Sequence, residues 1–157
     1  MEKPKTIWFL IILWIITCMF IFIQAAYYFH YGFQVKYADV TFNINNIGEF
    51  FISLICFSAS LLTLYSIYSK KKWSWLFNAL ISFTFIFYYT KMFVIIVTDI
   101  VFLSHYTSHQ GVYAIPFHIV HTIIYLILPL IVVAIFILLL RPEVKEYFKN
   151  EKLEGLI

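Results

Sequence analysis

Residues 7–29 read IWFLIILWIITCMFIFIQAAYYF, an apolar stretch without a single charged side chain. A helix of about 20 apolar residues crosses the roughly 30 Å hydrocarbon core of a bilayer. Three further stretches of predominantly apolar residues follow, at about 47–68, 75–103 and 117–140. The sequence therefore predicts an all-α, integral membrane four-helix bundle that forms a single domain over residues 1–157, with a short tail at 141–157.

The composition excludes a soluble protein. Hydrophobic residues make up 63% of the chain, charged residues only 12%, and the mean hydropathy is +0.90. A soluble domain of this size needs more polar surface than these residues supply. The net charge of +3 is spread over loops and ends and is not concentrated on one soluble face, so no nucleic-acid partner is expected.

The basic residues predict the orientation. They precede the first segment, link the second to the third, and follow the fourth: Lys3, Lys5, Lys70, Lys71, Lys72, Arg141, Lys145, Lys149 and Lys152. Since Lys and Arg accumulate in cytoplasmic loops, both termini and the tail are expected in the cytoplasm. The tail alternates acids and bases and is expected to be amphipathic or partly disordered. A bacterial inner membrane and a eukaryotic endomembrane both fit this pattern.

All of the histidines fall on the opposite, non-cytoplasmic side, together with three acids: His30, His105, His109, His118, His121, Asp39, Glu49 and Asp99. His118 and His121 are three residues apart, which places them on one helix face. With Asp99 and His105 they form a candidate site for zinc or copper, to which Glu49 or His109 are further candidate ligands. The alternative is that these histidines bond lipid headgroups and loop carbonyls.

A second pattern is a layer of polar residues inside the apolar segments. Counted from the cytoplasmic ends at about 1.5 Å per residue, the members lie about 22–29 Å up: Gln24, Glu49, Lys91, His121 and Tyr125. An ammonium inside hydrocarbon costs about 2.5–3.5 kcal/mol unless it is paired or reaches the interface. Glu49 is the expected partner of Lys91, with Asp99 as the alternative. The layer predicts the polar lining of a cavity for a mostly apolar ligand.

Segments two to four also resemble a known family. Glu49 is followed by a phenylalanine-rich span, a basic turn at Lys72-Trp73, a long aromatic segment, and the run Tyr125-Leu126-Ile127-Leu128-Pro129. This order is similar to the EXPERA family, the four-helix fold of the sigma-2 receptor and the sterol isomerases. The resemblance implies a sterol-like or cationic amphiphilic ligand held by Glu49. The family's second acid has no counterpart, because Gln24 or Ala25 occupies its place, and Lys91 adds a positive charge.

These observations favour a membrane protein that binds a membrane lipid or an amphiphilic small molecule. Two alternatives stay open: an accessory or assembly subunit of a larger membrane complex or homo-oligomer, and a protein that handles metal ions or protons through its histidines. No enzyme class follows, because the sequence shows neither a nucleophile–base pair nor a phosphate-binding loop. Cys18 and Cys56 lie within apolar segments and are expected to be buried thiols.

Overall fold

The computed structural model describes residues 4–32, 44–69, 73–106 and 115–149. Within these ranges, the side chains at 30–32, 44–46, 96, 99–106 and 115–122 lie outside the description. The described residues form the helices α1 (Lys5–Gly32), α2 (Ile44–Ser69), α3 (Ser74–Tyr106), α4 (Ile115–Leu140) and α5 (Pro142–Lys149). The predicted all-α class is confirmed.

Helices α1 to α4 are each long and apolar enough to cross a membrane. Each covers one of the predicted segments and extends beyond it by a few residues at one or both ends. Apolar side chains mark the part of a helix that fits in hydrocarbon, whereas the ladder of backbone hydrogen bonds continues into the polar boundary region. The tail forms a helix over its first part, α5, so the expectation of an amphipathic segment is confirmed for residues 142–149.

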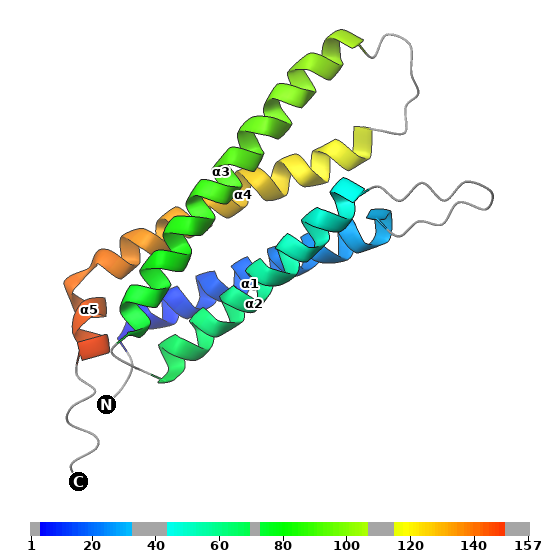
Figure 1. Ribbon diagram of the computed structural model, residues 1–157. Coiled ribbons are helices and arrows are strands. Elements are labelled where there is room, and N and C mark those ends of the chain that lie inside the picture. Colours follow the sequence, from blue (N-terminus) through cyan, green and yellow to red (C-terminus); the bar gives the residue numbers. More distant parts are fainter. Residues whose placement is uncertain (1–3, 33–43, 70–72, 107–114, 150–157) are drawn as a thin grey trace.

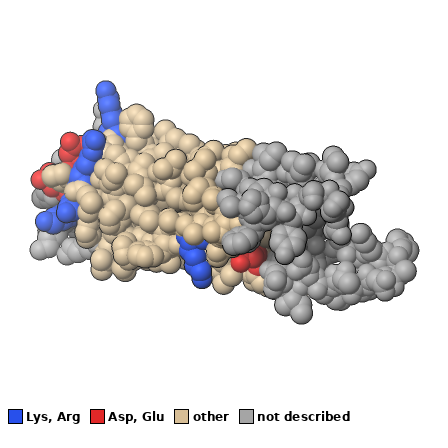
Figure 2. All heavy atoms as spheres, turned by 90° about the horizontal axis from the view of Figure 1, so that it is seen from above, with Lys and Arg blue, Asp and Glu red and all other residues tan. Residues whose placement is uncertain are grey.

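The helices associate in two pairs. Packing is closest between α1 and α2 and between α3 and α4, and the two pairs join through α1–α4 and α2–α3 contacts. Helix α1 begins, and α5 ends, at the same end of the bundle (Figure 1). We call this the proximal end and the opposite one the distal end. Charged side chains of the described surface gather mainly at the proximal end (Figure 2).

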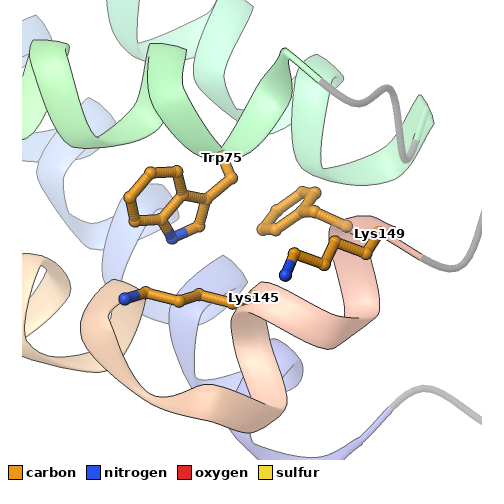
Figure 3. Close-up of a pocket in the computed structure, with 4 residues that line it drawn as sticks. Trp75, Lys145 and Lys149 are labelled. Carbon is orange, nitrogen blue, oxygen red and sulfur yellow. The ribbon is translucent and has the colours of Figure 1, made fainter.

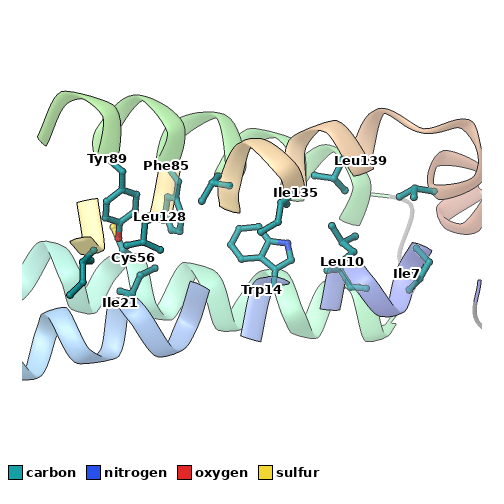
Figure 4. Packing of buried hydrophobic residues seen from close by; sticks show 14 of the residues in the cluster. Ile7, Leu10, Trp14, Ile21, Cys56, Phe85, Tyr89, Leu128, Ile135 and Leu139 are labelled. Atoms are coloured by element: carbon teal, nitrogen blue, oxygen red, sulfur yellow. The ribbon is translucent and has the colours of Figure 1, made fainter. Parts of the chain in front are cut away.

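Helices α1 and α4 bury apolar stripes against each other. The buried positions are three, four or seven residues apart, as in a coiled-coil seam: Ile7, Leu10, Trp14 and Ile21 on α1, and Leu128, Val132, Ile135 and Leu139 on α4. Figure 4 shows labelled side chains of both stripes, such as Trp14 and Ile135, meeting along the centre of the bundle. This seam holds the α1–α2 pair against the α3–α4 pair.

Helices α2 and α3 bury polar stripes with a similar spacing. The buried residues include Ser53, Ser60, Thr63 and Ser66 on α2, and Ser74, Asn78 and Ser82 on α3. The Asn78 amide donates to the Ser66 hydroxyl across the two helices at 2.7 Å. Large apolar side chains are exposed instead, Ile55 and Phe87 among them. Small polar residues inside and large apolar residues outside are typical of helices packed within a membrane.

Candidate ligand site between the four helices

The distal half of the bundle contains a chain of hydrogen bonds between α1 and α4. The Gln24 amide nitrogen on α1 donates to the Tyr125 hydroxyl on α4 at 2.6 Å. The hydroxyls of Tyr125 and Tyr28 lie 3.2 Å apart. Gln24 and Tyr28 are four residues apart and therefore share one face of α1. All three side chains are buried, so these bonds form away from bulk water.

Helices α2 and α3 complete this group of polar side chains. The Tyr88 hydroxyl on α3 donates to a carboxylate oxygen of Glu49 on α2 at 2.7 Å. The neighbouring Tyr89 ring lies 5.9 Å from the Tyr125 ring and 5.0 Å from the Tyr88 ring. Together these residues form what we call the distal cluster: Gln24, Tyr28, Glu49, Tyr88, Tyr89 and Tyr125. Each of the four long helices contributes at least one member.

Two buried polar atoms of the distal cluster have no hydrogen-bond partner among the described residues. They are the Gln24 carbonyl oxygen and the Tyr89 hydroxyl. If the Gln24 amide were turned so that its oxygen and nitrogen changed places, the nitrogen would be the atom without a hydrogen-bond partner. The Tyr89 hydroxyl lies beside the Cys56 thiol, a weak acceptor (Figure 4). An unpaired buried polar group costs about 1–3 kcal/mol, so a ligand that donates a hydrogen bond to the Gln24 carbonyl oxygen would remove this cost.

Proline in α4 affects a backbone carbonyl of the distal cluster. Pro129 lies inside this helix and has no N–H to donate to the carbonyl of Tyr125, four residues earlier. The sequence predicts that this carbonyl is available to other groups. This carbonyl belongs to the same residue whose hydroxyl accepts from Gln24.

The structure brings together three of the predicted lining residues. Gln24 and Tyr125 bond directly, and Glu49 reaches the same cluster through Tyr88. The expected ion pair between Glu49 and Lys91 is wrong: the Lys91 side chain is exposed, and no ion pair joins these two described residues. Tyr88 lies one helical turn before Lys91 on the same face of α3 and takes the carboxylate, while the long lysine chain extends outward.

Most of the predicted metal ligands fall outside the described side chains. His118 and His121 lie in α4 and Asp99 lies in α3, so the backbones of these three residues are helical as expected. His105 was expected in the loop after the third segment, but α3 continues to Tyr106 and includes it. The side chains of all four, and residues 39 and 109 altogether, lie outside the described part. The described side chains include no group of three His, Cys, Asp or Glu residues that could hold a metal ion. The zinc or copper site stays a prediction.

Both cysteines are buried and unpaired thiols, which confirms the prediction for them. Cys18 lies on α1 and Cys56 on α2, and each is less than one tenth exposed.

The sequence interpretation missed Tyr28, Tyr88 and Tyr89. The same count along the helix could have found the last two, since Tyr89 lies 15 residues after the start of α3, or about 22 Å along it. Comparison of the chain with family models, curated proteins and solved structures gave no match. The resemblance to the EXPERA family stays a prediction.

Chemically, the distal cluster offers one carboxylate, four phenol groups and one amide in an apolar surrounding. The carboxylate is the only charged group among them, and it is half-buried, whereas Gln24 and Tyr125 are fully enclosed. Such a set can accept hydrogen bonds or a positive charge from a ligand.

Proposed function

We propose that this chain is a multi-pass membrane protein whose distal cluster binds a lipid-like or amphiphilic molecule. The ligand's polar end, carrying a hydrogen-bond donor or a positive charge, bonds to Glu49, and its apolar body lies between the helices. The observation that carries this proposal is the polar cluster drawn from all four long helices, with the Gln24 carbonyl left unpartnered.

The proposed topology makes the distal end the non-cytoplasmic one. Support comes from the described charged residues at the proximal end: Lys5, Arg141, Lys145 and Lys149 with Glu143 and Glu146. Under the positive-inside rule this end faces the cytoplasm. The distal cluster then lies in the outer half of the membrane, where a ligand enters from the lipid and not from the cytoplasm.

An amphiphile fits the cluster better than a small polar solute does. Small-molecule sites are mostly apolar with a few placed polar groups that fix orientation. Here the polar groups are few, and the neighbouring buried residues Ile21, Phe85 and Leu128 are apolar. The resemblance to the EXPERA family, whose members hold such ligands through an acid at the position of Glu49, points to the same chemistry.

The test is lipid analysis of the purified protein, followed by a binding assay with the molecule found. Mass spectrometry of protein extracted in a mild detergent identifies the co-purifying molecule. Glu49→Gln removes the charge and keeps the size, and should abolish retention of that molecule. Glu146→Gln is the matched control, because Glu146 is an exposed acid on α5 at the other end. Equal retention by Glu49→Gln and the wild type would refute the proposal.

A role as an accessory subunit is the second candidate. Rows of aromatic side chains lie on the outside of the bundle, such as Phe83 and Phe87 on α3, whose rings are 4.9 Å apart. Lipid covers such a row equally well, so the mass of the particle in mild detergent separates the two cases. A discrete larger assembly favours a membrane-protein partner or a homo-oligomer.

The third candidate, metal or proton handling, predicts bound zinc or copper that is lost when His118 and His121 are replaced together.

A further inference from the structure

The tail helix α5 is fixed in place at the proximal end, beside the end of α4. Helix α4 ends at Leu140, and Pro142 opens α5 after a single intervening residue, Arg141. The backbone turns there through bonds such as the one from the Val144 N–H to the Arg141 carbonyl, 3.1 Å long. Val144 and Phe148 are buried in the bundle. The segment is therefore a packed part of the fold.

Glu143 lies on a different side of α5 from Lys145 and Lys149. Glu143 accepts a hydrogen bond from the Thr6 hydroxyl on α1 at 2.9 Å, so this flank faces the start of α1. Lys145 and Lys149 are four residues apart and share the other flank, which faces Trp75 of α3 (Figure 3). Glu146 is exposed. The two ammonium groups beside Trp75 are thus separated from the acid that bonds α1.

The space between this basic flank and α3 is a cavity of about 440 Å³, lined by Trp75, Lys145, Phe148 and Lys149. The indole N–H of Trp75 donates to the Leu139 carbonyl at 2.7 Å, one of the last-turn carbonyls of α4 that lack a helical partner. This bond fixes the indole ring as one wall. The Lys145 ammonium lies 5.2 Å from the centre of that ring. The cavity therefore has an aromatic wall and two positive charges at its edge.

We propose that this cavity binds the headgroup of an anionic phospholipid, with the phosphate between the ammonium groups of Lys145 and Lys149. The rings of Trp75 and Phe148 contact the glycerol and the first carbons of the acyl chains. The site lies at the end of the membrane-spanning helices, where headgroups are found, and its charge complements a phosphate. It is separate from the distal cluster, so it does not depend on the function proposed for that cluster.

The experiment is native mass spectrometry of the full-length protein in a mild detergent, titrated with phosphatidylglycerol or with phosphatidylcholine of the same acyl chains. A lysine near an anionic lipid contributes about fivefold in affinity, so K145Q/K149Q should bind phosphatidylglycerol roughly thirtyfold more weakly. Binding of phosphatidylcholine should be unchanged. K145R/K149R keeps both charges and should retain the preference, which separates loss of charge from loss of fold.

The matched control is K5Q/R141Q, which removes two positive charges from the same end without touching the cavity. It should bind phosphatidylglycerol within about twofold of the wild type, since its charges act only at longer range. Equal weakening by both double variants would show a general effect of charge and overturn the site. An unchanged affinity of K145Q/K149Q would also overturn it. Displacement of the lipid by an equal concentration of glycerol 3-phosphate would mean that no lipid is needed, and would overturn the assignment to a phospholipid.

Discussion

Replacing Tyr125 with phenylalanine removes one hydroxyl from the distal cluster and changes little else. That hydroxyl accepts from the Gln24 amide at 2.6 Å and lies 3.2 Å from the Tyr28 hydroxyl. Its loss leaves both polar atoms of the Gln24 side chain buried without a described partner. Such a group costs about 1–3 kcal/mol in soluble proteins, but hydrogen bonds between membrane helices average about 0.6 kcal/mol, with a maximum near 1.7. We therefore expect a loss of about 1–2 kcal/mol.

The assay is reversible unfolding in mixed micelles of dodecyl sulfate and a mild detergent, followed by tryptophan fluorescence. Tyr65→Phe is the matched control, because Tyr65 is 60% exposed on α2, and it should change the free energy of unfolding by less than about 0.5 kcal/mol. A double-mutant cycle with Gln24→Leu should be non-additive, because the second change removes the amide that the first leaves unpaired. Additive losses, or a Tyr125→Phe variant as stable as the wild type, would refute the reasoning.

Three further predictions concern other parts of the bundle. Trp75→Phe removes the hydrogen bond to the Leu139 carbonyl and should destabilise the protein by about 1 kcal/mol. Trp73→Phe, at an exposed ring, should not destabilise it, and equal melting temperatures of the two variants would contradict this prediction. Cys18 and Cys56 should resist labelling by maleimide in the folded protein and should react after denaturation, which mass spectrometry would show. Rapid labelling of the folded protein would mean that the bundle is more open than described. Val144→Ala removes two buried methyl groups and should loosen α5, with faster proteolysis of the tail than in the wild type; an unchanged cleavage rate would argue against its packing.

The sequence was sufficient to predict the helices, because four long apolar stretches have no alternative to helix in a bilayer. It also predicted that Gln24 and Tyr125 lie at a similar height, since counting residues along each helix gives the height of its side chains, and the structure joins the two by a hydrogen bond. The same count does not give the direction in which a side chain points around its helix. For this reason Glu49 and Lys91 were expected to pair, although Tyr88 takes the carboxylate.

Two features of the interior depend on tertiary packing. The polar stripes of α2 and α3 are buried, and they meet where Asn78 donates to Ser66, while α1 and α4 supply the apolar seam. The spacing of these polar residues, as in Ser53, Ser60 and Thr63, is visible in the sequence. The sequence alone does not show whether this face of the helix is buried or exposed. The packing of α5 was likewise hidden, because its alternating charges are equally typical of a solvated tail.

The most direct test of the central claim is to locate a bound amphiphile by photo-crosslinking. The purified protein is illuminated with a long-chain alkylamine that carries a diazirine beside the amine, and the labelled residues are identified by mass spectrometry. Labelling should concentrate on residues of the distal cluster, such as Tyr28 and Tyr88, and should fall sharply in Glu49→Gln but not in Glu146→Gln. Label spread evenly over exposed positions such as Phe9 and Leu80, and unaffected by Glu49→Gln, would contradict ligand binding at the distal cluster.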